Sequence, residues 1–328
     1  MPNSSGKLSM SVVTCTYASA RTEQLALLVD ALRSQTEPPE QIIVVVDHNP
    51  ALLPDLRARL PDVVVTPNAQ DRGLSGGRNT GLELATGDLV AFIDDDAIPE
   101  PDWLERLRDA YRDPAVIGVG GQVEPSWEGA VPSWFPAEFG WVVGCGYTGL
   151  PQTPAPVRNF IGCNMSFRRQ EIAAMGGFRI DLGRVGLAPV GCEETEFCIR
   201  LVHDRPGRQL RFEPRARVHH SVPRNRLTWA YFRARCYSEG RSKARVARIS
   251  GTSSALSSER SYVTRTLAHA VAATAPRWAR GDRSAPLRSA AIMAGLAMTT
   301  LGYVVGRWEL AVGRERLAAA WSAPVHQP

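Results

Sequence analysis

The sequence predicts an α/β protein with a mostly parallel central sheet flanked by helices, and two patterns support this fold class. Short runs rich in β-branched residues recur four times, at residues 8–14, 41–47, 62–66 and 88–93. After the first run, four apolar residues follow the spacing of one helical face, namely Leu25, Leu28, Val29 and Leu32. Strands that alternate with helical segments are typical of parallel βαβ units.

Length and composition indicate one large domain, or one domain with an appendage. The 328 residues are 44% hydrophobic, which is enough for a sizeable core. A Ser-rich polar segment at 250–260 is typical of a linker, and an Ala-rich helical pattern follows it. We therefore predict a main domain at 1–249, and a linker with a helical C-terminal region at 250–328.

The C-terminal region contains an uncharged stretch at 289–306. Its length lies near the lower limit for crossing a bilayer, and Gly, Thr and Ala reduce its hydrophobicity. A packed or interfacial helix and a membrane span are both open. The net charge of +5 and the pI of about 9.0 favour anionic partners such as phosphates or lipid headgroups.

The N-terminus runs from a polar lead directly into the first strand, without the basic and apolar regions of a signal peptide. The six cysteines form no CxxC pair, so reduced thiols are expected. These features predict a cytoplasmic protein, for which attachment to the cytosolic face of the plasma membrane is an option.

Three consecutive aspartates, Asp94, Asp95 and Asp96, follow an apolar strand. Like charges this close repel one another, and strands disfavour aspartate. Ligands of an open α/β sheet bind beyond the carboxyl ends of the strands. We therefore expect a hard divalent cation with oxygen ligands, Mg²⁺ or Mn²⁺, at this turn. A solvated acidic turn is the alternative.

A glycine-rich segment at 71–79 leads into a helix start, so its backbone amides and Arg78 can approach anionic oxygens closely. The same segment satisfies the GxSxG pattern with Ser75 at its centre, and aspartates and histidines follow in the chain order of an α/β-hydrolase triad. A nucleophile elbow requires a strand that runs directly into the serine, and residues 67–72 intervene. A serine hydrolase with Ser75 as nucleophile stays open as a competing function.

Two further clusters supply acid–base groups. Glu193, Glu194 and Glu196 lie at an expected helix start, where the macrodipole stabilises negative charge. Such a carboxylate can serve as general base toward an acceptor hydroxyl. His219 and His220 follow a basic segment, and a neutral imidazole there can complete the coordination of the cation.

The ordered set of these motifs resembles the inverting family 2 glycosyltransferases of the GT-A fold, from residue 8 to about residue 245. In that family the first two segments contact the nucleotide, the next two precede and form the acidic motif, and the last lines the sugar and acceptor side. The segments that carry the likeness are 11–17, 44–47, 73–81, 87–96 and 160–168.

The resemblance implies transfer of a sugar from a nucleotide-diphosphate donor, such as a UDP-sugar, to an acceptor hydroxyl with inversion. It implies Mn²⁺ or Mg²⁺ as cofactor, held by Asp96 and Asp94 with His220. It places Glu194 at the position of the catalytic base, with Glu193 as the alternative. The residues expected to contact the donor are Thr14, Thr16, Tyr17, Asp47, Gly73, Ser75, Arg78, Asn79, Asp94, Asp95 and Asn164.

The acceptor stays open among a lipid-linked glycan, a polysaccharide and a small natural product, and peripheral membrane contact fits the first of these. Nucleic acid is not expected, because the aromatic residues among the arginines of 226–248 are needed for the apolar face of a helix. A nucleotide-sugar-binding protein without catalysis is the remaining alternative, since binding residues alone do not prove turnover.

Overall fold

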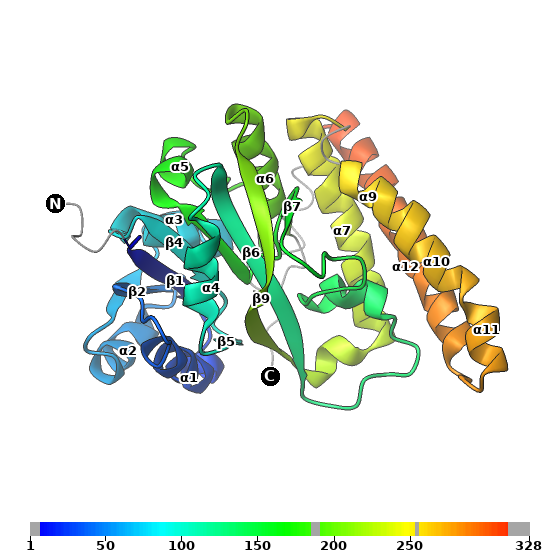
Figure 1. The fold of residues 1–328 in the computed structure, drawn as a ribbon, viewed down its shortest axis with the longest axis horizontal. Coiled ribbons are helices and arrows are strands. Elements are labelled where there is room, and N and C mark those ends of the chain that lie inside the picture. Colours follow the sequence, from blue (N-terminus) through cyan, green and yellow to red (C-terminus); the bar gives the residue numbers. More distant parts are fainter. Residues whose placement is uncertain (1–6, 185–190, 253–255, 314–328) are drawn as a thin grey trace.

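The computed structural model describes residues 7–184, 191–252 and 256–313. Figure 1 shows a twisted sheet with its covering helices and, beside it, a layer of helices formed by α7 and α9 to α12. The chain passes through the sheet first and ends in the helical layer. The layer includes α7 (Trp229–Ser250), which precedes the boundary expected between residues 249 and 250.

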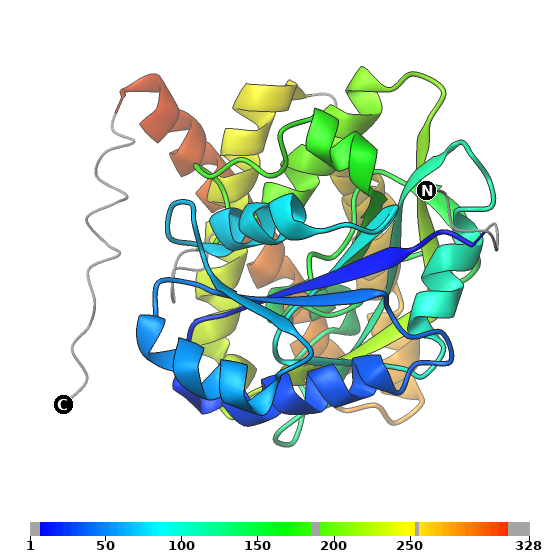
Figure 2. The same ribbon diagram turned by 90° about the vertical axis from the view of Figure 1, so that its left-hand side faces the viewer.

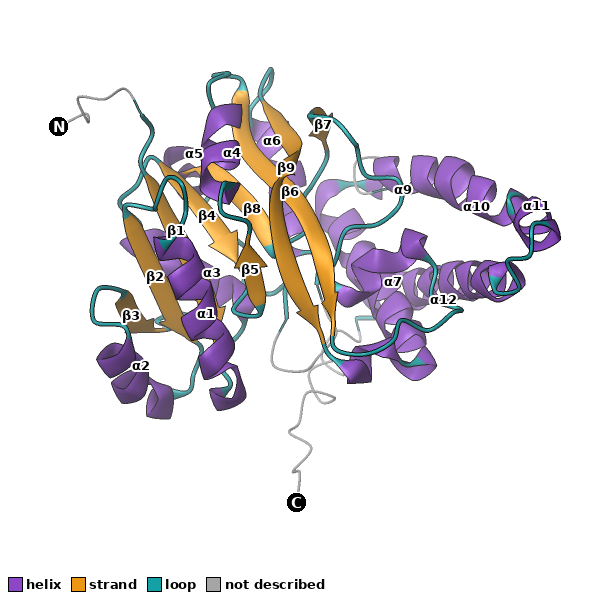
Figure 3. Ribbon diagram, turned by 60° about the horizontal axis from the view of Figure 1, so that its bottom comes forward, coloured by secondary structure: helices purple, strands orange, loops and turns teal. Residues whose placement is uncertain are grey.

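In the described part of the chain, nine strands form one sheet in the order β3-β2-β1-β4-β8-β6-β9-β5, with β7 paired to β9 (Figure 3). The strands are β1 (Met10–Thr16), β2 (Gln41–Val46), β3 (Val64–Pro67), β4 (Leu89–Ile93), β5 (Ala97–Pro99), β6 (Val116–Trp127), β7 (Ala155–Val157), β8 (Asn164–Arg168) and β9 (Gln209–Val222).

The helices fall into those that cover the sheet and those of the C-terminal layer. The first group is α1 (Thr22–Arg33), α2 (Leu53–Arg59), α3 (Leu74–Leu84), α4 (Trp103–Ala110), α5 (Arg169–Ala174) and α6 (Glu193–Asp204). The second group is α7 (Trp229–Ser250), α9 (Ser257–Ser261), α10 (Ala268–Ala272), α11 (Thr274–Ala279) and α12 (Ala285–Ala311). Short helical turns are η1 (Ser19–Arg21), η2 (Pro50–Leu52), η3 (Ala137–Val143), η4 (Arg224–Leu227) and the π-helical η5 (Tyr262–Leu267).

The first half of the sheet confirms the four predicted strands. The β-branched runs form β1 to β4, and β1 lies parallel between β2 and β4, with Val12 opposite Ala91. Parallel strands begin and end together, so their carboxyl ends lie at one edge of the sheet. That edge carries Thr16, Asp47 and Asp94.

Two apolar clusters lie on opposite faces of the sheet. Val12 belongs to the cluster that α1, α2 and α4 complete, and its neighbour Val13 belongs to the cluster that α3, α5 and α6 complete. Side chains alternate between the two faces of a strand, so a sheet with apolar residues on both faces needs two covering layers. Figure 2 shows α1 and α2 (blue) on one side of β1 and α3 (cyan) on the other.

The second half of the sheet is mixed, so the expectation of a mostly parallel sheet holds for the first half only. β8 runs antiparallel between β4 and β6, and β9 pairs parallel with β6 and antiparallel with β5. The segment 160–168, which carries part of the family likeness, contains β8, and this strand begins at Asn164. In the β5–β9 pairing, Ala97 lies opposite His220, which carries the histidine to the acidic turn.

The helices α7 and α12 lie side by side at very short range. A Cβ atom built on Gly302 of α12 would lie 2.0 Å from the carbonyl oxygen of Tyr237, and one built on Gly240 of α7 would lie 2.0 Å from that of Thr299. Only glycine permits such a close approach of two backbones. The pairing of these helices therefore depends on glycines in both.

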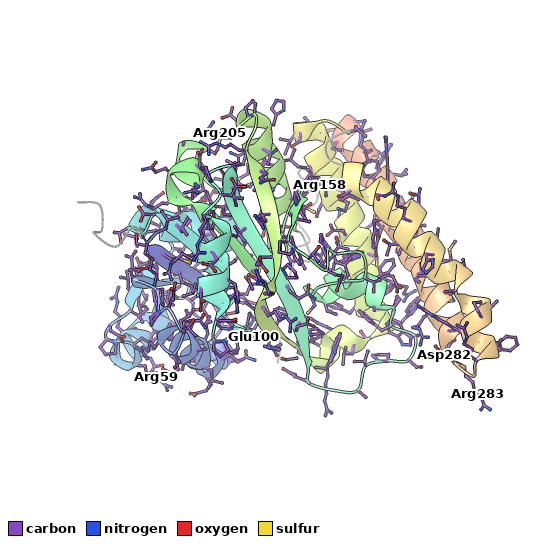
Figure 4. All side chains as sticks on the ribbon, in the orientation of Figure 1. Arg59, Glu100, Arg158, Arg205, Asp282 and Arg283 are labelled. Carbon is purple, nitrogen blue, oxygen red and sulfur yellow. The ribbon has the colours of Figure 1, made fainter. Side chains whose placement is uncertain are left out.

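The C-terminal region is also tied to the sheet domain. Glu259 of α9, within the expected linker, forms ion pairs of 2.5 Å with both Arg158 and Lys243. Figure 4 shows Arg158 at the side of the sheet that faces the helical layer. Leu267 and Ile292 belong to the same apolar cluster as β1 and β4. The C-terminal helices thus pack directly against the rest of the fold.

We expect Gly302→Val to lower the free energy of unfolding by about 2 kcal/mol, because overpacking of a close contact forces the two helices apart. Urea unfolding followed by circular dichroism measures this change. Ala297→Val is the matched control, since Ala297 lies on the exposed side of the same helix. Equal stability of the two variants would contradict the close packing of α7 on α12.

Candidate functional site: a metal cluster and two cavities

The acidic turn and β9 form a cluster of possible metal ligands. Asp94, Asp96 and His220 each offer one ligand atom, and these atoms lie within 4.8 Å of one another. Asp94 follows directly on β4, and the backbone N–H of Ser221 donates to the carbonyl oxygen of Asp96 at 2.9 Å. Strand pairing therefore holds the aspartates and the histidine together.

The donor set of this cluster fits Mn²⁺ or Mg²⁺. Among the described residues, Oδ1 of Asp96 is buried and receives no hydrogen bond, and it lies 3.4 Å from Nε2 of His220. Burial lowers the pKa of His220, although the neighbouring Asp96 opposes this effect. A neutral imidazole and a carboxylate oxygen without a partner are suited to a hard or borderline divalent cation.

His219, the other member of the doublet, points elsewhere. Its side chain is exposed, and its Nε2 lies 3.3 Å from Oε1 of Glu100. Neighbouring residues of a strand face opposite sides. Of the two histidines, only His220 reaches the aspartates.

The middle aspartate has a different environment from its neighbours. Asp95 is buried and pairs with Arg21 at 2.5 Å, and the same guanidinium reaches Oδ2 of Asp96 at 3.0 Å. Burial raises the pKa of Asp95 to about 6, and Arg21 opposes this rise. Asp95 therefore holds Arg21 against the acidic turn and stands outside the ligand cluster.

A small cavity opens at the carboxyl edge of the parallel strands, and we call it the small cavity. Of the residues expected to contact the donor, Thr16, Tyr17, Asp47, Asp94 and Asp95 line this cavity, and Arg21 lines it as well. Thr14 lies two residues before Thr16 in β1 and is buried.

Asp47 lines this cavity and accepts hydrogen bonds from the segment that follows β3. Its carboxylate accepts hydrogen bonds from the backbone N–H of Gly73 at 3.1 Å and from Nδ2 of Asn68 at 2.7 Å. Gly73 has φ of 133°, a value that L-residues rarely adopt. Asp47 thus faces the small cavity and also fixes the start of the glycine-rich helix α3.

Three polar side chains expected to meet the donor are used inside the fold. Nδ2 of Asn79 donates to the carbonyl oxygen of Phe178, and Asn164 is fully buried and receives the indole N–H of Trp103. Neither amide lines the small cavity or the large cavity defined below. The third, Ser75, is also buried.

The position of Ser75 argues against the serine hydrolase. Its hydroxyl donates to the carbonyl oxygen of Leu182 at 2.7 Å, and the residue lies in the first turn of α3. The loop 68–73 separates it from β3, so no strand runs into the serine as a nucleophile elbow requires. The GxSxG match is a helix start that packs against a neighbouring loop.

Arg78, which was expected to approach anionic oxygens of the donor, lines the large cavity defined below. It is almost fully buried and bonds to Oε1 of Glu193 at 2.9 Å, to Oδ1 of Asp94 at 3.3 Å and to the carbonyl oxygen of Gly162 at 2.8 Å. Arg78 therefore links the metal cluster to the start of α6.

The carboxylates at the start of α6 differ in their partners. Glu193 is buried against Arg78, whereas Glu194 is half-buried and accepts a hydrogen bond from the hydroxyl of Thr195. Burial raises the pKa of Glu194, and the negative charge of Glu193 adds to the rise. The raised pKa strengthens the tendency of Glu194 to take a proton.

Glu194 lines a second cavity of about 440 Å³, which we call the large cavity. Arg158, Arg235 and Lys243 also line it, and each forms an ion pair with Glu239 or Glu259 of the same cavity. Its apolar walls come from η3 and the C-terminal helices, and include Phe139, Trp141, Tyr262, Val263, Leu296 and Tyr303. Such a space accommodates a ligand with a substantial apolar part.

A family model for glycosyl transferase family 2 matches residues 11–174, half of the chain. The chain belongs to this family. The matched segment includes β1 to β4, the acidic turn and β8, so it covers most of the small cavity and both aspartates of the metal cluster. Membership in a family of transferases also sets aside the serine hydrolase and the non-catalytic binding protein.

This family 2 glycosyltransferase is similar to two curated relatives along most of its length. It is 39% identical over 233 residues to the glucosyl-dolichyl phosphate glucuronosyltransferase of Haloferax volcanii, covering 69% of this chain and 74% of the relative. It is 29% identical over 255 residues to the succinoglycan biosynthesis protein ExoM of Rhizobium meliloti, covering 75% and 77%.

A solved structure shows the fold. The mannosyltransferase of Pyrobaculum calidifontis, in complex with GDP-Man and Mn²⁺, matches with a TM-score of 0.58 at 20% identity, over 96% of this chain and 90% of that one. The family 2 glycosyltransferase therefore has the GT-A fold that its motifs led us to expect, with a mixed sheet and a C-terminal helical layer.

Two arginines of the site have no sequence signal of their own. Arg21 lies in η1 and contacts two of the three aspartates, and Arg184 lines both cavities. Neither belongs to a charged cluster or a spaced motif in the sequence. Only the fold brings them to the carboxyl edge of the sheet.

We expect Asp96→Asn to weaken Mn²⁺ binding by roughly tenfold or more, because a buried ligand oxygen is lost. Electron paramagnetic resonance of free Mn²⁺ during a titration measures the affinity. Asp95→Asn makes the same chemical change one residue away and should retain most of the affinity, since Asp95 pairs with Arg21. Equal losses in both variants would show that the triplet acts as a general negative charge.

Proposed function

We propose that this enzyme transfers a sugar from a nucleotide-diphosphate donor, a UDP-sugar in the first instance, to an acceptor hydroxyl with inversion. The observation that carries the proposal is the junction of the two cavities. Leu74, Asp94 and Arg184 line both of them, so Asp94 of the metal cluster lies where the cavities join, and His220 and Glu194 both line the large cavity. Donor and acceptor can therefore meet at Asp94.

The proposed roles follow from this arrangement. Glu194 takes the proton of the acceptor hydroxyl, the acceptor oxygen attacks the anomeric carbon from the large cavity, and the nucleoside diphosphate leaves into the small cavity. Attack and departure on opposite sides invert the anomeric carbon. A Mn²⁺ or Mg²⁺ ion held by Asp94, Asp96 and His220 would neutralise charge on the leaving diphosphate.

Two observations support a lipid-linked acceptor as the substrate class. The apolar walls of the large cavity suit a lipid or another apolar group beside the acceptor sugar. The relative from Haloferax volcanii is named as acting on glucosyl-dolichyl phosphate, which is a lipid-linked sugar. A polyprenyl-phosphate-linked sugar is therefore the first acceptor to assay, with the free sugar as comparison.

We expect Glu194→Gln to reduce kcat by about 10²-fold or more, because the amide cannot accept the proton. The assay is release of UDP from a panel of UDP-sugars with Mn²⁺ and the polyprenyl-phosphate-linked acceptor. Glu83→Gln on the exposed side of α3 is the control and should keep wild-type turnover. Normal turnover by Glu194→Gln would remove Glu194 from the mechanism.

The raised pKa of Glu194 gives a pH prediction. A base works only when unprotonated, so activity should be present above its pKa and fall as pH decreases through it. Because the pKa is raised, this fall should begin above the ordinary value for glutamate, about 4.3. Glu193→Gln removes a neighbouring negative charge and should move the acidic limb of the kcat/KM profile to lower pH. An unchanged or upward-shifted limb would contradict the assignment.

A further inference from the structure

The helix α12 has an exposed apolar face that the fold does not use. One side of the helix packs its glycines on α7, and another lines the large cavity with Leu296 and Thr299. On the remaining side, Met293, Leu301 and Val304 are 54%, 50% and 57% exposed. Their spacing places them on one stripe of the helix, which we call the α12 stripe.

The positive charge of the chain is concentrated in the helical layer that carries the α12 stripe. Residues 224–313 contain fifteen Arg and Lys residues and four Asp and Glu residues. Residues 1–223 contain seven more acidic than basic residues. The helical layer is therefore strongly cationic, while the sheet domain is anionic. A cationic layer with an exposed apolar stripe fits a surface that is anionic outside and apolar beneath.

Positive charge and exposed apolar surface occur together around the turn between α11 and α12. Arg280 and Arg283 are exposed in this turn, and Arg277 and Trp278 are exposed at the end of α11, with Trp278 at 62%. Figure 4 shows Arg283 at the tip of the helical layer, directed away from the protein. Tryptophan and arginine at one helix end are the residue types found at a membrane–water interface.

The packing of α7 decides between lying on a membrane and crossing it. By length and composition alone, α12 is apolar enough to cross a bilayer. However, a Cβ built on Gly295 would lie 3.0 Å from Phe232 of α7, and one built on Gly306 would lie 3.1 Å from the Cα of Arg241, so α7 packs along α12 between these two glycines. A spanning α12 would take Arg241, Lys243 and Arg245 into hydrocarbon, which is strongly unfavourable.

We propose that the helical layer docks on an anionic lipid bilayer, with α12 in the plane of the interface and the α12 stripe among the headgroups. The arginines of the α11–α12 turn then contact lipid phosphates. Docking would hold the wall formed by Leu296 and Thr299 near the lipid surface. This docking does not depend on which acceptor the enzyme uses, and vesicle binding tests it without any measurement of turnover.

The test is cosedimentation of the full-length protein with vesicles of phosphatidylcholine alone, or of phosphatidylcholine with phosphatidylglycerol. The wild type should bind the mixed vesicles, and added salt should weaken the binding. Leu301→Glu combined with Val304→Glu should weaken binding by at least about tenfold, because two apolar side chains no longer enter the interface. Arg280→Glu combined with Arg283→Glu should abolish the preference for mixed vesicles.

Leu27→Glu is the matched control, since Leu27 is 62% exposed on α1 in the sheet domain. It should bind vesicles as the wild type does. Thermal unfolding and Mn²⁺ affinity of each variant verify that it is folded.

Three results would overturn the proposal. The first is a wild type that does not bind mixed vesicles, or a stripe variant that binds equally well. The second is a dimer in light scattering that the stripe substitutions dissociate, which would make the stripe an interface between copies. The third is resistance of the bound enzyme to carbonate extraction, which would indicate a membrane span.

Discussion

The buried guanidinium of Arg78 is the interaction on which the geometry of the site depends. A charge removed from water requires compensating partners, and here the partners are Asp94 and Glu193. Asp94 belongs to the metal cluster, and Glu193 precedes the proposed base. The carbonyl oxygen of Gly162 takes a further donor of the same group. One side chain thus connects the two halves of the site, and its loss would leave the buried carboxylate of Glu193 without this partner.

Long-range strand pairing positions the residues of the metal cluster, as Arg78 positions the start of α6 near Asp94. His220 is more than a hundred residues from the aspartates, and the β5–β9 ladder places it beside Asp96. The orphaned oxygen of Asp96 and the neutral imidazole are consequences of that burial. Arg21 then balances the remaining charge of the turn through Asp95 and Asp96.

The two cavities differ in how much of the chain they require. The small cavity is formed mostly within residues 11–174, the part that the family model matches. The large cavity needs α6, β9 and the C-terminal helices, and α12 reaches it only because glycines let α7 and α12 pack closely. The proposed donor side and the proposed acceptor side are thus formed by different parts of the chain.

Local patterns in the sequence determined the parts of this protein that depend on neighbours in the chain. Hydrophobic periodicity predicted β1 to β4 and α1, and charge density at a strand end predicted the acidic cluster. The start of α6 with Glu194 also follows from local charge and periodicity. These features can be predicted from the hydrophobic period of a segment and the types of its residues alone.

The tertiary structure decided which polar side chains face the cavities and which support the fold. Asn79 and Asn164 have residue types suited to binding, and both are used inside, because a buried backbone group nearby requires a partner. The mixed half of the sheet was not predictable, since β9 interleaves arginines with apolar residues and pairs with strands far away in the chain. Arg21 reaches the aspartates for the same reason: contacts between distant segments leave no period in the sequence, and only the folded chain determines them.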